Sequence, residues 1–195
     1  MTSLYYWSEF INSVTAVIHR RTTQNEEAIV HAIAQTAIQL NRTDPDLESV
    51  RKTVTTPTDE PYISECVHRA PGLQISVIKL PQDGYIGLHD HPQMTGVILC
   101  LSGQLRVESY DLVDNVTGAD HVMLRLISDA ILLPGQVGTL TSQRGNIHRL
   151  TPDNSAVELI DIFHPGYTPA RLAAASGYVI EEGSGNSLFR ARRTN

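Results

Sequence analysis

The chain has 195 residues, of which 41% are hydrophobic and 18% are charged, a composition typical of one globular domain with a small appendage. Fifteen lysines and arginines stand against twenty-one acidic residues, so the net charge is −6 at pH 7 and the isoelectric point is near 5.7. Phosphate backbones and anionic lipids repel a negative chain, which argues against nucleic acid or a membrane surface as a partner.

The chain lacks the sequence features of export and of membrane insertion. Its densest apolar run, residues 96–101, is far shorter than the roughly 18 residues that a transmembrane helix needs. Glu9 interrupts the apolar stretch that a signal peptide would require, so we expect no secretion by that route. Cys66 and Cys100 do not form a C-x-x-C motif, and we therefore expect no disulfide and a reducing compartment, the cytoplasm or also the nucleus.

Residues 1–55 are predicted to be helical, because their apolar side chains recur at three- and four-residue spacing. Thr23 and Glu26 have the spacing of a capping box at the start of a second helix. Asp44 followed by Pro45 is typical of the N-cap and first turn of a third. We assign residues 1–55 to an N-terminal helical segment that packs on the remaining domain.

From about Tyr62 the apolar period changes from 3.6 to 2, which is the alternation of strands with one buried face. Short apolar runs alternate with turn-forming clusters of proline, glycine and asparagine. This pattern predicts an antiparallel sandwich or a small barrel over residues 56–185. Residues 186–195 contain several arginines and are expected to form a solvated basic tail.

Three of the eight histidines are spaced so that they can bind a metal ion. His89 and His91 lie two residues apart on an extended segment, so their imidazoles share one face while Asp90 points to the other. His148 follows a turn and opens a later strand, at what can be the adjacent part of the barrel. Three imidazoles suit iron, zinc, copper or nickel and leave coordination positions open, as catalytic metals require.

The three-histidine set lacks the carboxylate of the common iron site that uses two histidines and one acid. A neutral shell leaves the charge of a divalent ion uncompensated, which favours an anionic, soft ligand such as a thiolate. Asp161 shares a strand face with Val157 and Leu159, so its carboxyl group is expected to point into the barrel. A buried acid of this kind needs a partner.

Several short motifs lie between about residues 62 and 167. They are IGLHDHPQMT at 86–95, SG at 102–103, VESYD at 107–111, GNIH at 145–148, LIDI at 159–162 and PGY at 165–167. In this order they resemble the signature of the thiol dioxygenases, in the branch that contains the plant cysteine oxidases and cysteamine (2-aminoethanethiol) dioxygenase.

The resemblance implies a cupin fold, a mainly β, double-stranded β-helix barrel (jelly roll) with N-terminal α-helices. It implies that His89, His91 and His148 hold Fe(II), with Asp161 and Tyr167 beside it as catalytic residues. The implied reaction uses O2 to oxidise a thiol to its sulfinic acid. The thiol would be cysteamine or the N-terminal cysteine of a peptide, in the setting of N-terminal degradation signals and oxygen sensing. We expect a cytoplasmic monomer.

The chain departs from the family pattern at positions beside the expected site. Gln93 replaces the usual glycine, and His164 stands where the family tends to have a glycine, which could alter the adjoining loop. Gly96 occupies the position at which cysteine dioxygenase carries the cysteine of its internal thioether. A cysteine–tyrosine crosslink is therefore not supported.

The sequence offers no evident arginine clamp for the carboxylate of free cysteine. Strand alternation turns Arg106 and Arg149 away from the barrel interior, and Arg69 is undecided. We therefore expect peptides that begin with cysteine to be better substrates than free cysteine. The open alternatives are a free L-cysteine dioxygenase, a zinc- or manganese-dependent cupin enzyme such as an isomerase, and a small-molecule-binding cupin without enzymatic activity.

Overall fold

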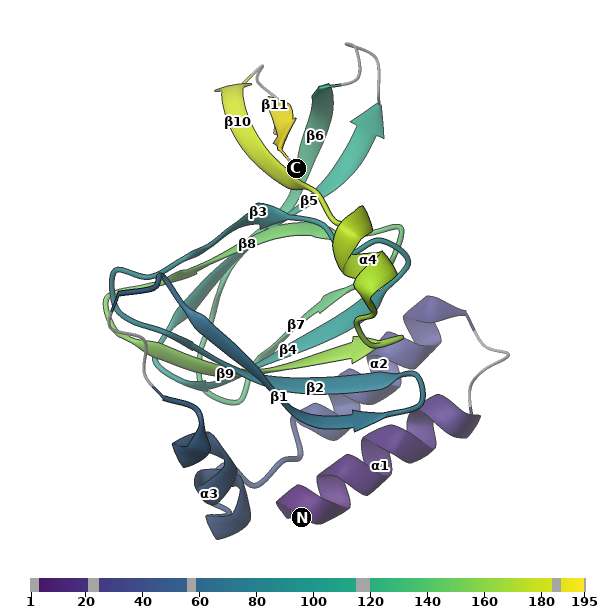
Figure 1. Ribbon diagram of the computed structural model, residues 1–195, viewed down its shortest axis with the longest axis vertical. Helices are drawn as coiled ribbons and strands as arrows, with labels where there is room; N and C mark the ends of the chain where they lie inside the picture. Colours follow the sequence, from purple (N-terminus) through teal and green to yellow (C-terminus); the bar gives the residue numbers. More distant parts are fainter. Residues whose placement is uncertain (1–3, 21–24, 56–58, 115–119, 184–186, 195) are drawn as a thin grey trace.

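The change of apolar period near Tyr62 marks a change from helices to strands (Figure 1). The computed structural model describes residues 4–20, 25–55, 59–114, 120–183 and 187–194. The helices are α1 (Trp7–Arg20), α2 (Glu26–Ala37), α3 (Pro45–Thr53) and α4 (Pro169–Ala174). The strands are β1 (Ile63–Ala70), β2 (Leu73–Leu80), β3 (Ile86–His89), β4 (Thr95–Ser102), β5 (Leu105–Asp114), β6 (His121–Leu132), β7 (Val137–Leu140), β8 (Ile147–Pro152), β9 (Val157–His164), β10 (Gly177–Gly183) and β11 (Leu188–Thr194).

Two antiparallel sheets enclose the barrel. The first has the strand order β1-β2-β9-β4-β7, and the second has the order β10-β11-β6-β5-β8-β3. The second sheet closes on itself, because Gly177 of β10 pairs with His89 of β3. The mainly β barrel with N-terminal helices that the sequence predicts is thus confirmed.

The first sheet is apolar on both faces. Residues such as Ile75 and Ile160 pack against the apolar stripes of α1 and α2, which lie on the outer face of the sheet (Figure 1). Residues of the opposite alternation, such as Ile98 and Leu159, face the barrel interior. Burial on both faces explains why β4 reads as a continuous apolar run rather than as an alternating one. No described helix is both long and apolar enough to cross a membrane.

The N-cap of α3 is the one that the sequence predicts, whereas the N-cap of α2 is a different residue. Asp44 caps α3 by accepting a hydrogen bond from the amide of Asp46, as predicted, and it also accepts one from the amide of Trp7. The N-cap of α2 is Asn25 and not Thr23, because the Asn25 side chain accepts from the amide of Ala28 at 2.9 Å. The predicted capping box is therefore wrong; Thr23 itself lies outside the described residues.

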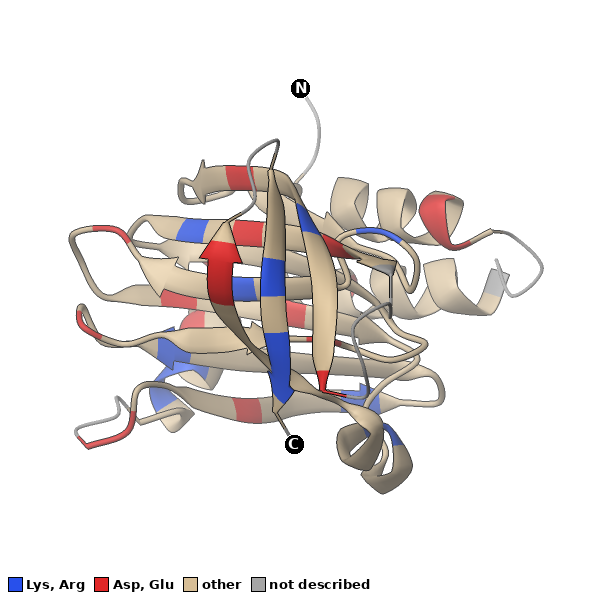
Figure 2. Ribbon diagram, turned by 90° about the horizontal axis from the view of Figure 1, so that it is seen from above, with Lys and Arg blue, Asp and Glu red and all other residues tan. Residues whose placement is uncertain are grey.

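The expectation of a solvated basic tail at residues 186–195 is also wrong. Residues 188–194 form β11, which pairs with β10 on one side and with β6 on the other. Arg190 and Arg192 lie on the outer face of this strand, where they approach Glu181 of β10 at 3.9 and 3.5 Å, whereas Arg193 lies on the other face, over the ring of Tyr178. Figure 2 shows these basic and acidic segments side by side. Ala191, on the opposite face, is fully buried in a core cluster.

We predict that Ala191→Asp destabilises the protein, because it places an unpaired carboxylate in that cluster. A loss of about 3 kcal/mol in the free energy of unfolding, or about 10 °C in Tm, is expected in thermal unfolding followed by circular dichroism. Arg192→Gln, on the exposed face of the same strand, should change Tm little. Equal Tm values for the two variants would show that β11 is not part of the fold.

Candidate metal centre

The structure brings His89, His91 and His148 together. His89 ends β3 and pairs in register with His148 of β8, while His91 lies in the turn that follows β3. Their ring centroids are 4.6 to 4.9 Å apart, and one nitrogen of each ring lies within 4.8 Å of the others. Chain segments distant in sequence therefore point three imidazoles at one place.

The three imidazoles are neutral, which is the form that binds a metal. Burial lowers the pKa of His89. Burial also lowers the pKa of His91 and His148 well below the usual range, and for these two residues the neighbouring imidazoles lower it further. The Nε2 atoms of His91 and His148 are 3.1 Å apart. Two nitrogens each about 2.1 Å from one ion, at right angles, are about 3.0 Å apart, so this donor set fits a metal ion.

Hydrogen bonds hold the outer ring nitrogens of two of the three imidazoles. The Nδ1 of His89 donates to the carbonyl of Gly87 at 2.8 Å, and the Nδ1 of His91 lies 2.7 Å from the hydroxyl of Tyr167, which can act as donor or acceptor. A proton on Nδ1 leaves the lone pair on Nε2, which is the nitrogen aimed at the common centre. The bond to Gly87 therefore sets the tautomer of His89 that a metal ion needs, and the bond to Tyr167 fixes the orientation of the His91 ring.

Asn146, within the motif GNIH, positions His91 through its backbone. The side-chain oxygen of Asn146 accepts from the amide of His91 at 2.8 Å, and its nitrogen donates to the carbonyls of His91 and Thr141, both at 3.0 Å. The sequence analysis did not assign this role. The sequence feature that could have indicated this role is the position of Asn146 two residues before the candidate ligand His148. A side-chain amide can both accept from a backbone amide and donate to a backbone carbonyl, so it can replace the strand hydrogen bonds that His91 lacks.

Asp90 faces away from the three imidazoles, as strand alternation predicts. One carboxylate oxygen accepts from the amide of Ser176 and the other from the hydroxyl of Tyr178, both at 2.7 Å. The segment between the two histidines is thereby attached to the start of β10. The second sheet thus closes beside the candidate metal centre.

The departures from the family pattern now have structural positions. Gln93 has φ of 59°, a left-handed conformation that glycine adopts without strain. His164 is turned away from the three imidazoles, since its Nδ1 donates to the carbonyl of Gly72 in the β1–β2 turn. Gly96 lies against the ring of Phe163, and a Cβ there would approach a ring carbon at 2.6 Å, so a cysteine at this position would require the Phe163 side chain to move.

Asp161 points into the barrel interior, between Ser76 of β2 and Ile98 of β4 in register. Its Oδ1 is buried without a hydrogen-bond partner among the described residues, and burial raises the pKa of the carboxyl group to about 8. Tyr167 packs against Met94, Leu140 and Phe163, and burial, followed by the nearby Asp161 charge, raises the pKa of its hydroxyl. Tyr167 is therefore in contact with His91, and Asp161 lies near Tyr167.

Two of the arginines weighed from the sequence lie in ion pairs outside the barrel interior. Arg106 pairs with Asp129 at 2.6 Å, and Arg149 forms a two-point ion pair with Glu108. Arg69 is largely exposed, but its guanidinium group donates to the side-chain oxygen of the buried Gln74 at 2.6 Å and to the backbone carbonyl of Tyr167 at 3.1 Å.

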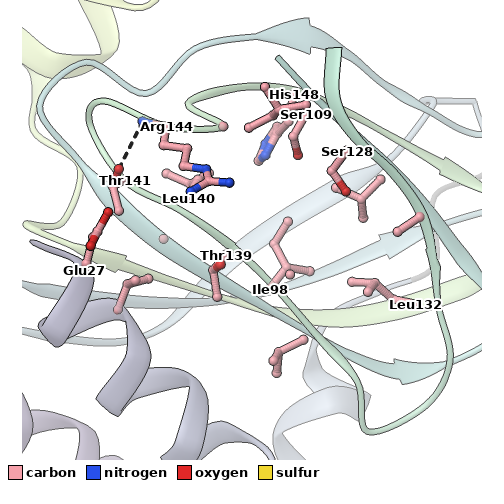
Figure 3. A pocket seen from close by; sticks show the side chains of 18 residues that line it. Glu27, Ile98, Ser109, Ser128, Leu132, Thr139, Leu140, Thr141, Arg144 and His148 are labelled. Atoms are coloured by element: carbon pink, nitrogen blue, oxygen red, sulfur yellow. Dashed lines mark hydrogen bonds between the residues drawn. The ribbon is translucent and has the colours of Figure 1, made fainter. Parts of the chain in front are cut away.

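A cavity of about 430 Å³ lies between the two sheets and opens near α2 (Figure 3). His148 and Ile98 line its inner part, and Glu27 and Arg144 are its charged lining residues. Since Ile98 is the cross-strand neighbour of Asp161, the cavity leads to the region of the acid and the histidines.

Comparisons with known proteins give a family match. The sequence profile of the PCO_ADO family matches residues 29–184. The 2-aminoethanethiol dioxygenase of Mus musculus is 26% identical over an alignment of 125 residues, with a coverage of 53% of this chain and 48% of that protein. Plant cysteine oxidase 1 of Arabidopsis thaliana is 29% identical over 105 residues, 52% of this chain and 36% of that protein. The chain therefore spans less than half the length of these relatives.

A solved structure is similar in fold alone. It is an uncharacterized conserved protein with a double-stranded beta-helix domain from Klebsiella pneumoniae. It has a TM-score of 0.46 and 15% sequence identity, over 60% of this chain and 87% of that chain.

We predict that Asn146→Ala lowers the affinity for Fe(II) by about 10- to 100-fold, because His91 loses the side chain that fixes its backbone. Anaerobic competition with a chromophoric chelator measures this affinity. Gln143→Ala, at an exposed position of the same loop, is the matched control and should bind the metal like the unchanged protein. An unaltered affinity of the Asn146 variant would contradict the role assigned to this side chain.

Proposed function

The chain belongs to the PCO_ADO family, and from this premise we propose that it is an Fe(II)-dependent thiol dioxygenase that oxidises a thiol to its sulfinic acid. The observation that carries the proposal is the convergence of three imidazoles on one place inside the barrel, one of them in contact with Tyr167, which lies near the interior acid Asp161. In this reaction the sulfur loses four electrons and O2 gains four, so both oxygen atoms end on sulfur and no further reductant is needed.

His89, His91 and His148 would hold the iron. When bound, Fe(II) supplies a binding position for a thiolate and the electrons that activate O2. Because the three imidazoles bring no charge, an anionic sulfur ligand is favoured over a neutral one.

Asp161 would bind the ammonium group of the substrate. Its carboxyl group lies in the barrel interior, where an ion is poorly solvated and an opposite charge is strongly attracted. An ammonium group beside it compensates for burial and favours the ionised carboxylate. The hydroxyl of Tyr167 is hydrogen-bonded to Nδ1 of His91 and would keep that ring in position while the substrate binds.

A site that recognises a thiol and an amine accepts several substrates. Cysteamine and a peptide with N-terminal cysteine both present these two groups. Arg106 and Arg149 form ion pairs outside the barrel interior, and Arg69 is hydrogen-bonded to Gln74 and Tyr167. Each of the three arginines is thus already engaged, which supports our expectation that such peptides are better substrates than free cysteine.

Oxygen uptake tests this proposal. We predict that the iron-loaded protein consumes O2 with cysteamine and with peptides that begin with cysteine, and more slowly with free cysteine at equal concentration. His148→Ala should abolish uptake and lower iron content, because two imidazoles remain. Full activity of this variant would exclude the three-histidine site, and a clear preference for free cysteine would identify the alternative amino-acid dioxygenase.

Asp161→Asn tests the role of the buried acid. We expect the fold and the iron content to be retained and turnover to fall by about 100-fold, because the amide keeps the shape but not the charge. The fall should be larger for substrates with a free amine than for a thiol without one, such as 2-mercaptoethanol. Equal rates of the variant and the parent with every active thiol would make Asp161 a structural residue.

A further inference from the structure

We propose that Arg144 binds a carboxylate carried by the second or third residue of a substrate peptide that begins with cysteine. The inference rests on the proposed function and concerns the part of the substrate beyond the reacting residue. No sequence pattern singled out this arginine, which lies in the loop between β7 and β8, immediately before the motif GNIH.

Arg144 faces the cavity that leads to the candidate metal centre. Figure 3 shows its side chain turned into the cavity, toward the side on which His148 lies. The inner part of the cavity reaches Ile98, the cross-strand neighbour of Asp161. A substrate with its ammonium at Asp161 can therefore extend through this cavity toward Arg144.

The loop that carries Arg144 is held at several points. The amide of Arg144 donates to the hydroxyl of Thr141, and its carbonyl accepts from the amide of Thr141 at 2.9 Å. The amide and the hydroxyl of Ser142 both donate to the carboxylate of Glu26 at the start of α2. Asn146 joins the same loop to His91. The backbone of Arg144 is thus fixed relative to the candidate metal centre, which reduces the entropy cost of binding an anion there.

Arg144 also has no protein anion to neutralise it. Among the ion pairs of the residues that the structure describes, none includes Arg144, whereas Arg106 and Arg149 each have an acidic partner. Glu27 lines the same cavity, but it is not within ion-pair distance of Arg144. The guanidinium group is therefore available for a carboxylate, which it can bind through two parallel hydrogen bonds.

Strand spacing indicates which carboxylate can reach Arg144. Asp161 of β9, Ile98 of β4 and Gly138 of β7 lie in one row across the first sheet. Adjacent strands are about 4.8 Å apart, so the backbone of β7 at Gly138 is about 10 Å from that of Asp161, and Arg144 follows in the loop after β7. The amine and carboxylate of free cysteine share one carbon atom and span too little of this distance. An extended peptide advances about 3.3 to 3.6 Å per residue, so its second or third residue can span it.

Peptides that differ in one charge test the inference. The C-terminally amidated peptides Cys-Asp-Gly-Gly and Cys-Asn-Gly-Gly have nearly the same shape, and a second pair carries Asp or Asn at the third position. In one of the two pairs, we expect kcat/KM of the aspartate peptide to be about fivefold higher than that of the asparagine peptide. An effect of this size lies between those of exposed and of buried ion pairs. Arg144→Gln should bring this ratio close to one, and Arg144→Glu should reverse it.

Two further variants separate a local contact from the net charge of the protein. Arg106→Gln removes one positive charge outside the cavity and should preserve the preference for aspartate. Glu27→Gln removes the acid that lines the cavity and should increase it. Cys-Gly with a free C-terminus, compared with its amide, shows whether a main-chain carboxylate at the second residue is bound as well as a side-chain carboxylate.

A binding measurement without turnover separates the proposed role of Arg144 from the proposed dioxygenase activity. Peptides that begin with serine instead of cysteine cannot form a sulfinic acid, and calorimetry can compare the Asp and Asn forms on the parent protein and on Arg144→Gln. The inference is overturned if the parent binds both forms equally or if the variant keeps the preference. Oxidation of no thiol at all would instead contradict the proposed dioxygenase, while the calorimetric comparison would still decide the role of Arg144.

Discussion

Three imidazole nitrogens that point at one place inside an apolar barrel are the constraint on which the rest of the site depends. Without a shared cation, their lone pairs face each other at 3.1 Å between His91 and His148, with no proton to separate them at neutral pH. Such an arrangement persists only if the outer ring nitrogens and the backbone are held from outside. Gly87, Tyr167 and Asn146 supply those contacts.

The same contacts link the centre to the rest of the fold. Asn146 joins the β7–β8 loop to the turn after β3, and Glu26 joins this loop to α2. Asp90 joins the histidine segment to the start of β10. Hydrogen bonds therefore connect helix α2, the β7–β8 loop and the start of β10 to the segments that carry the three histidines. Packing changes far from the centre can in this way alter its geometry.

The alternation of side chains along an extended segment predicted those features of the site that are set within a single segment. It gave the shared face of His89 and His91, the outward direction of Asp90 and the inward direction of Asp161. It could not predict Asn146 or Arg144, because their roles arise from loop contacts that no strand or helix period encodes. The last strand, β11, was missed because its buried face is marked by one small residue between arginines, which resembles a solvated terminus.

The cavity has an acidic group near one part and a basic group at another. Asp161 lies next to Ile98, which lines the inner part of the cavity, and Arg144, for which the described residues provide no ion-pair partner, lines it from the β7–β8 loop. A peptide with a free amine at one end and a carboxylate one or two residues further would meet an opposite charge at each position. Recognition of this kind depends on spacing as well as on charge, which a single-point carboxylate clamp does not provide.

Mass spectrometry of a cysteine-initiated peptide after reaction under isotopically heavy dioxygen tests the central claim most directly. We expect a sulfinic acid product in which both added oxygen atoms are heavy, and no such product from the N-acetylated peptide, because acetylation removes the ammonium that Asp161 would bind. A product with oxygen from water, or equal oxidation of the acetylated peptide, would contradict a dioxygenase that recognises the thiol and the amine together.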